Sequence, residues 1–285
     1  MNIINTSGAM LEAFDSGGFQ IEKWKTYADA AVPGLKEMCL EDLRETLNAG
    51  CSWEDHYLPV LNSAARDTAK REKAMASFRC VTDHLDERIT KRFQRTVDAD
   101  IILYLGLCNG AGWVTTINGT RCVLLGIEKI MELDWCDTDA MTGLIVHELG
   151  HVYQDQYGVL HREPESMPDR FLWQLFTEGI AMVFEQEIVG DPEYFHQDRQ
   201  GWKQWCDSHV KRIAQSFSMD LKSMSQENQR YFGDWVSFDG HCDAGYYLGA
   251  RFVRFLLEYD TFDRMILYGI REVKDGFIRF LDSVL

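Results

Sequence analysis

The segment from Gly143 to Gly158, GLIVHELGHVYQDQYG, holds two histidines and a glutamate in the pattern HExxH. On a helix, side chains four residues apart share a face, so His147 and His151 can bind one ion. Glu148 lies beside them, where a carboxylate can take a proton from a water that the metal activates. The motif predicts that His147 and His151 bind Zn²⁺ and that Glu148 is the general base. The alternative is three polar residues that merely share a helix, because the pattern is short.

A catalytic zinc site needs a third protein ligand and an open fourth position. The segment LFTEGIAMVFEQ offers Glu178. On a helix Glu178 shares a face with Phe171, Leu175 and Met182, so it interrupts an apolar stripe in which an unpaired carboxylate is costly. A metal would remove this cost, and so would a salt bridge, and both interpretations stay open. A lone histidine is more often an ordinary surface or core residue than a ligand, and this applies to the remaining candidates, His161, His196, His209 and His241.

The helices that position these residues can be placed from apolar periodicity and from capping residues. We expect one helix over residues 137–157, begun by Asp137 or Thr138 and closed by Gly158. A second helix, over residues 169–189, carries Glu178 and is closed by Gly190. Helices continue to the C-terminus, and one of them begins near Asp243.

The first third of the chain has a different pattern. Residues 21–93 are helical in periodicity, and KEMCLEDLRETLNAG ends at a glycine typical of a helix C-terminus. Glycine then alternates with β-branched runs in DADIILYLGLCNGAGWVTTINGTRCVLLG, where Asn118-Gly119 predicts a type I′ hairpin turn. We therefore expect an α+β fold, mostly helical, with a small mixed sheet packed on the HExxH helix. We expect an N-terminal helical region over residues 1–95 and a catalytic region over residues 96–285, as one large domain or two closely joined pieces.

Composition and charge limit the classes of partner. The chain has 285 residues, 46% of them hydrophobic, which is enough for a substantial core. Its 45 acidic and 29 basic residues give a formal net charge of −16, which repels phosphate backbones and anionic lipid surfaces. We expect neither nucleic acid nor a membrane as a partner. No segment has the pattern of a signal peptide or a membrane span, and the eight cysteines stand singly, so we expect a cytoplasmic protein with reduced thiols.

The combination of HELGH, TEGIA and GYYLGARFVRFLLE resembles the gluzincin zinc metallopeptidases, and more narrowly a bacterial family of predicted zinc-dependent proteases. The similarity covers roughly residues 99–257. It implies a zincin-like catalytic core in which Glu178, within the TEG run, is the third zinc ligand. It also implies that Tyr246, in the YxxG run, hydrogen-bonds the tetrahedral intermediate. The hairpin resembles the substrate-binding edge strand of gluzincins, which pairs with the backbone of an extended peptide, and it implies the substrate-binding residues Gly112, Trp113, Val114 and Thr115.

One related class is excluded, and two departures limit what the resemblance to gluzincins implies. The metzincin pattern would need glycine and histidine where this chain has Gln154 and Tyr157, so that class is excluded. The glutamate with which related aminopeptidases hold a free amine is missing from the segment GAGWV, so exopeptidase specificity is not supported. Thermolysin-like enzymes have an aspartate where this chain has Met182. The outer partner of the zinc ligands therefore stays open, with three candidates, Asp155, Asp239 and Asp243.

The sequence thus predicts a hydrolase, a zinc metalloprotease of the gluzincin type, which acts on a peptide or protein substrate. Zn²⁺ held by His147, His151 and Glu178 would lower the pKa of its water toward about 7, and Glu148 would take the proton and pass it to the leaving amine. The alternative is a regulatory or catalytically silent zinc-binding module that binds or processes one cytoplasmic partner. The net negative charge argues against strongly acidic substrates. The sequence leaves the cleavage specificity and the oligomeric state open.

Overall fold

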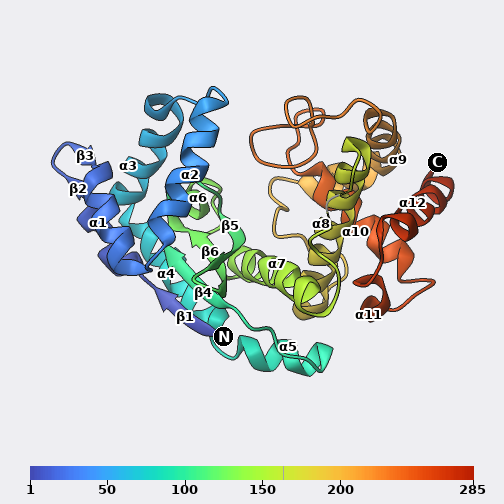
Figure 1. Cartoon of the computed structure of the whole chain (residues 1–285), viewed down its shortest axis with the longest axis horizontal. Helices are drawn as coiled ribbons and strands as arrows, with labels where there is room; N and C mark the ends of the chain where they lie inside the picture. The colour runs from blue at the N-terminus through green and yellow to red at the C-terminus, as the bar shows by residue number, and fades with distance from the viewer. Residues whose placement is uncertain (163) are drawn as a thin grey trace. The chain divides into compact units, whose positions relative to one another are not determined.

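The computed structural model describes residues 1–162 and 164–285 (Figure 1). The chain forms two compact units, Met1–Glu148 and Leu149–Leu285. The division falls within one unbroken helix, α7 (Thr138–Tyr157), which contains the HExxH motif. The fold is of the α+β class, with many helices and a small mixed sheet, as the sequence predicts.

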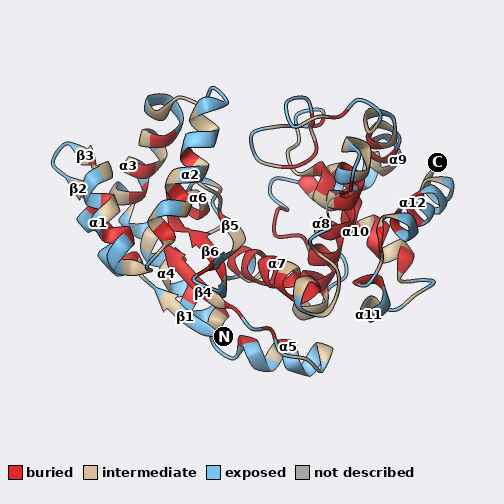
Figure 2. Cartoon of the chain, viewed as in Figure 1, coloured by how far each residue is buried: buried red, intermediate tan, exposed pale blue. Residues whose placement is uncertain are grey.

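The sheet of the first unit has four strands in the order β1-β4-β6-β5. Strands β1 (Asn2–Asn5), β4 (Asp100–Tyr104) and β6 (Thr120–Gly126) are parallel, and β5 (Gly112–Ile117) runs antiparallel to β6. Most residues of β4 and β6 are buried (Figure 2), because these two central strands are covered on both faces. Strand β5 is left at one edge of this sheet.

The hairpin that joins β5 to β6 has the predicted turn. Ile117 pairs with Thr120, so the loop contains only Asn118 and Gly119. Their φ angles are +51° and +81°, both in the left-handed region that a type I′ turn requires. Asparagine and glycine adopt this region at low cost, which is why this dipeptide could be recognised from the sequence.

The N-terminal region is helical over most of its length, and it also contributes a strand to the sheet. Its first residues form β1, which pairs with β4 from Asn2↔Asp100 onward. The boundary expected between residues 95 and 96 lies inside the first compact unit. The helices of this unit before α7 are α1 (Ile21–Ala31), α2 (Leu35–Asn48), α3 (Leu58–Arg66), α4 (Thr68–Thr82), α5 (Leu85–Phe93) and α6 (Ile127–Glu132). Shorter elements are a 3₁₀ helix (Ser7–Ala13), a π-helical turn (Trp53–Tyr57) and the strands β2 (Phe14–Asp15) and β3 (Gly18–Phe19).

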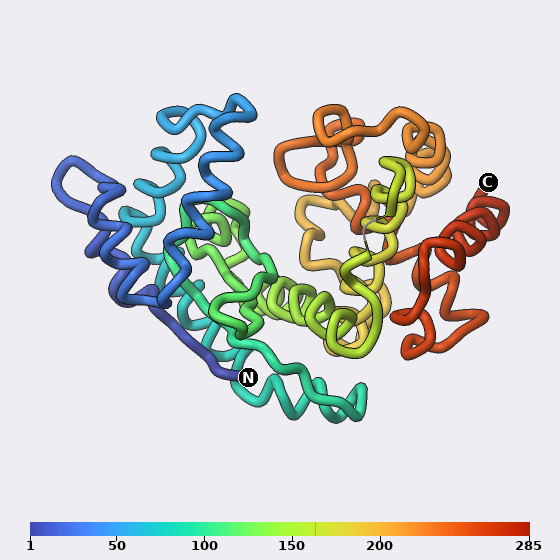
Figure 3. Tube along the Cα trace, viewed as in Figure 1, coloured from blue at the N-terminus to red at the C-terminus, as the bar shows by residue number. Residues whose placement is uncertain are grey.

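The second unit is helical, and its central element is α8 (Met167–Val189). Ser166 caps the start of α8 by accepting a hydrogen bond from the Asp169 N–H, and Gly190 ends it with a φ of +86°. The helix therefore begins two residues before the predicted start and ends where predicted. A long loop joins α9 (Trp202–Asp220) to α10 (Ala244–Leu256) (Figure 3). The other helices of the unit are α9 (Trp202–Asp220), α10 (Ala244–Leu256), α11 (Phe262–Met265) and α12 (Ile270–Val284).

Helices α8 and α10 cross at a pair of glycines. A Cβ atom on Gly179 would overlap the carbonyl of Gly249, and one on Gly249 would lie 2.5 Å from the carbonyl oxygen of Leu175. The two backbones therefore touch directly, which only residues without a side chain permit. This crossing places the N-terminal half of α10 beside the stretch of α8 that carries Glu178.

None of the helices in residues 1–162 and 164–285 combines the length and the apolar character that crossing a membrane requires.

Candidate metal centre

Helix α7 presents the two motif histidines one turn apart. Its start is fixed by Asp137, whose Oδ1 accepts a hydrogen bond of 2.9 Å from the Ala140 N–H. Of the two predicted caps, the structure therefore selects Asp137. His147 and Glu148 are buried, with 4% and 8% of their surface exposed, and the His151 side chain is 15% exposed. The motif is thus enclosed by protein rather than displayed on a solvated helix face.

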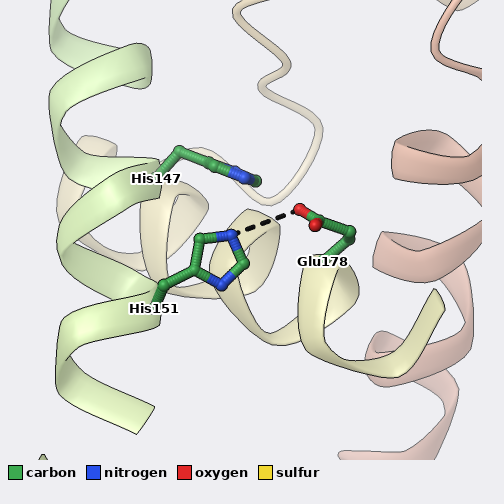
Figure 4. A group of neighbouring side chains, drawn as sticks. All are labelled: His147, His151 and Glu178. Carbon is green, nitrogen blue, oxygen red and sulfur yellow. Dashed lines mark ion pairs between the residues drawn. The ribbon is translucent and has the colours of Figure 1, made fainter. Parts of the chain in front are cut away.

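Glu178 reaches His151 because α7 and α8 approach closely. A Cβ atom on Gly150 would lie 2.9 Å from the Cα atom of Ala181, so the backbones meet next to His151 and one turn after Glu178. His151 Nε2 lies 3.3 Å from Glu178 Oε2, and each of the two side chains is 15% exposed (Figure 4). The carboxylate that interrupts the apolar stripe of α8 therefore points at the motif helix.

His147, His151 and Glu178 each offer one ligand atom, and these atoms all lie within 4.8 Å of one another. In a tetrahedral site with bonds of about 2.1 Å, ligand atoms lie roughly 3.4 Å apart, which the 3.3 Å separation of His151 and Glu178 matches. Two imidazole nitrogens and one carboxylate oxygen are also a donor set that zinc accepts. A salt bridge alone would explain His151 and Glu178 but not the convergence of His147. The residues present therefore fit a zinc ion.

Strand β5 lies against the predicted general base. A Cβ atom on Gly112 would lie 2.9 Å from both Cγ and Oε1 of Glu148, so a larger residue at this position would displace the Glu148 side chain. Trp113 is half-buried, and its indole Nε1 donates a hydrogen bond of 3.0 Å to the Tyr104 hydroxyl. Val114 and Thr115 follow on the same edge strand and are also half-buried. The structure thus brings the first predicted substrate-binding residue into contact with Glu148.

Tyr246 and Tyr247 lie in the first turn of α10 but differ in their surroundings. Tyr247 is buried, and its hydroxyl donates to Asp207 Oδ1 at 2.7 Å and accepts from Arg251 Nε at 3.1 Å. Tyr246 is half-buried, and its ring packs edge-on against Phe232 with centroids 5.9 Å apart. The two hydrogen bonds give the Tyr247 hydroxyl a structural role.

The other histidines lie elsewhere among the described residues. His161 is 3.7 Å from Asp155, and His209 and His241 stack on Trp205 with centroid distances of 4.4 and 3.8 Å. Within the part of the chain that the structure describes, His147, His151 and Glu178 are the one group with metal-ligand geometry.

His196 is a buried residue whose role the sequence does not reveal. Its Nδ1 lies 3.0 Å from Glu185 Oε2, and its backbone N–H donates to Glu185 Oε1 at 3.2 Å. Glu185 stands two helical turns after Glu178, so the two carboxylates share a face of α8. The spacing of the two glutamates could have indicated this second polar position, but no pattern connects it to His196.

Glu128 is a second buried carboxylate, in the first unit. Its two oxygens accept hydrogen bonds from the N–H groups of Gly106 and Cys108, at 2.9 and 3.0 Å, and burial raises its pKa to about 7. These bonds hold the loop that leads from β4 to β5. Glu128 thus shapes the approach to the edge strand and takes no part in the metal group.

Comparison of the chain with family models, with curated proteins and with solved structures finds no match. The resemblance to gluzincins therefore depends on the motifs alone, and function has to be argued from the geometry of the site.

Proposed function

We propose that this chain is a zinc-dependent metalloprotease of the gluzincin type, which hydrolyses peptide bonds. The observation that carries the proposal is the convergence of His147, His151 and Glu178, three buried or half-buried donors from two helices. A carboxylate, Glu148, follows the first of these ligands on α7. This arrangement provides three protein ligands and a neighbouring base, which is the composition of a hydrolytic zinc site.

Zinc bound by these residues would supply a Lewis acid that lowers the pKa of a water molecule to about 7. Glu148 would accept a proton from that water as its oxygen attacks the peptide carbonyl carbon. The same carboxyl group would then donate the proton to the leaving amine, so Glu148 ends the cycle ionised, as it began. Its low exposure, 8%, would keep bulk water from competing for the proton.

Strand β5 would hold the substrate. As the edge strand of the sheet, it offers backbone groups on the side away from β6, and an extended peptide can add to them as a further strand. The contact between Gly112 and Glu148 puts the start of this strand next to the base. Residues Gly112, Trp113, Val114 and Thr115 are therefore proposed to align the peptide backbone.

Tyr246 is proposed to donate a hydrogen bond to the carbonyl oxygen as negative charge develops on it. The variant Tyr246→Phe keeps the ring and its packing on Phe232 and deletes only the hydroxyl. We expect kcat to fall roughly a hundredfold, with zinc content and thermal stability close to those of the parent.

Tyr247→Phe is the matched comparison, because its hydroxyl bonds Asp207 and Arg251. It should lower thermal stability and leave kcat near that of the parent. The assignment of Tyr246 would be off by one position if only Tyr247→Phe lost activity, and the donor would lie elsewhere if both variants stayed active.

The test of the proposal pairs metal analysis with a peptide-library digest. We expect about one zinc per chain and cleavage of a subset of peptides, with cleavage abolished by a chelator and restored by Zn²⁺. Zinc without turnover on the library or on casein would favour the binding module, in which the same residues hold the metal for a regulatory purpose. A chain that binds no zinc would refute both functions.

A further inference from the structure

One carboxylate oxygen of Asp243, the residue before α10, accepts a hydrogen bond within the chain, and the other oxygen is available to a ligand. Its Oδ1 accepts a hydrogen bond of 3.2 Å from the Gly233 N–H. Among the residues that the structure describes, nothing donates to its other oxygen, and no lysine or arginine lies within ion-pair distance of it. The side chain is half-buried, so it keeps a path to solvent.

The surroundings of Asp243 are unfavourable for a negative charge. Burial is the main cause that raises its pKa to about 6, and the charges of Asp234 and Glu178 act in the same direction. His196 acts in the opposite direction, but its ring is already paired with Glu185 at 3.0 Å. The charges of Asp234 and Glu178 thus act on Asp243 together with one imidazole that is shared with Glu185, so the position is short of positive charge.

The contacts of neighbouring residues place His196 near the start of α10. The ring of Phe195 packs at a tilt against Tyr247 with a centroid distance of 5.5 Å, and Gln197 Nε2 lies 3.8 Å from Met182 Sδ on α8. The residue between them therefore lies where the Glu178 face of α8 meets the N-terminus of α10. The segment that contains His196 is also hydrogen-bonded to the residue before Asp243, because Trp202 Nε1 donates to the Cys242 carbonyl at 2.8 Å.

Asp243 also lies at a distance from Glu178 that a peptide can span. It precedes Gly249 by six residues, about 9 Å along a helix axis, and Gly249 touches Gly179, the neighbour of Glu178. An extended chain advances about 3.3 Å per residue. A charged group two or three residues from the scissile bond, or at the end of a long side chain, can therefore reach this carboxylate.

We propose that Asp243 binds a cationic nitrogen group of the substrate, and that the substrates are peptides with a positive charge close to the scissile bond. This inference rests on the proposed protease function. The group is either a free α-amine or the side chain of lysine or arginine, since both present N–H donors and a positive charge. The segment GAGWV has no carboxylate for this purpose, and Asp243 would supply one from another element.

The test measures peptide binding to zinc-loaded Glu148→Gln, which should hold substrate without turning it over. Two pairs of peptides are compared. The first pair has one sequence, with a free N-terminal amine or with an acetylated one. In the second pair both peptides are N-acetylated and carry lysine or norleucine at one position. We expect a cationic peptide to bind roughly tenfold more tightly than its neutral partner, as a charge-assisted hydrogen bond implies. A preference for the free amine identifies the α-amine as the ligand, and a preference for lysine over norleucine identifies the side chain.

The added substitution Asp243→Asn should abolish the preference and leave the neutral peptides unaffected. Asparagine retains an oxygen for the Gly233 N–H and tolerates the left-handed φ of +59° at this position. Asp239→Asn is the matched control, because Asp239 belongs to the same loop, has a φ of +51° and pairs with Arg212 at 2.7 Å. It should keep the preference.

Equal binding of all four peptides by the chain with Asp243 intact would overturn the inference about Asp243. If the parent chain still cleaved peptides, the proposed protease function would stand without it. Loss of zinc in the Asp243→Asn variant would also overturn it, since the carboxylate would then serve the metal ligands. If the parent cleaves no peptide and Glu148→Gln binds none, the proposed function fails together with the inference.

Discussion

Glu148→Gln is expected to abolish peptide hydrolysis while zinc stays bound. Glutamine has the shape of glutamate but cannot accept the proton of the attacking water, so general-base catalysis is lost, a fall in kcat on the order of a thousandfold. The ligands His147, His151 and Glu178 are unchanged, and so is the close contact of this side chain with Gly112. The loss of hydrolysis is measured as the cleavage rate of a peptide from the library. The retention of metal is measured as the zinc content of the purified chain.

A matched control is Asp139→Asn, in the first turn of the same helix, where the side chain is exposed. It removes one negative charge from α7, as Glu148→Gln does, but far from the ligands, and it should keep both zinc and activity. Loss of zinc in Glu148→Gln would contradict its role as a base, because it would make this residue a ligand or a support for one. Parental activity in Glu148→Gln would remove the proposed mechanism.

The second prediction with a large effect concerns substitution of the three proposed zinc ligands. His147→Ala, His151→Ala and Glu178→Ala should each weaken zinc binding by more than about a hundredfold, because removal of an outer partner alone costs ten- to a hundredfold. A site with three protein ligands has no substitute for a lost one. Titration of each variant against a chelator of known affinity measures the change, and hydrolysis should be lost in parallel.

Glu178 is the decisive member of the three, since the gluzincin assignment depends on it. Glu187→Gln is its control on α8, because Glu187 pairs with Arg254 and stands more than two turns beyond Glu178. Zinc affinity should survive in Glu187→Gln and fall in Glu178→Ala. Parental affinity in Glu178→Ala would mean that another residue is the third ligand, and the assignment would fail.

The parts of the fold that could be predicted depend on short-range chemistry. Gly190 marks the end of α8 within the chain segment itself, and Asn118-Gly119 encodes its own turn. The pairing of Asn2 with Asp100 joins residues far apart in the sequence, so no local pattern indicates it. Gly158 shows the same limit, because it does follow α7 but without a left-handed φ.

At Gly158 the reason for glycine is tertiary rather than local. A side chain there would overlap the backbone of Ile266, which also accepts a hydrogen bond of 2.7 Å from the Val159 N–H. The sequence therefore places the end of the helix correctly and attributes it to the wrong cause. Such contacts become visible only when the partner segment is in place.

The residues of the candidate site also fall into those that the sequence indicates and those that only the folded structure brings together. His147 and His151 follow from helical spacing. Glu178 is indicated by the resemblance of the TEG run to gluzincins, and the cost of a carboxylate in an apolar stripe supports it. The pairing of His196 with Glu185 depends on how the loop after α8 folds back, and the sequence treats His196 as one lone histidine among several. The available oxygen of Asp243 likewise emerges only from its neighbours in space.

The glycine crossing of α8 and α10 has a consequence for how this sequence can drift over evolutionary time. Large apolar residues along the two helices can exchange volume with one another, since a loss on one side can be matched by a gain on the other. Gly179 and Gly249 have no such latitude, because backbone lies against backbone and no neighbouring substitution can make room for a methyl group. In distant relatives these two glycines should therefore outlast the bulky side chains around them, and an alignment anchored on them would locate the ligand-bearing turn even where TEGIA has diverged.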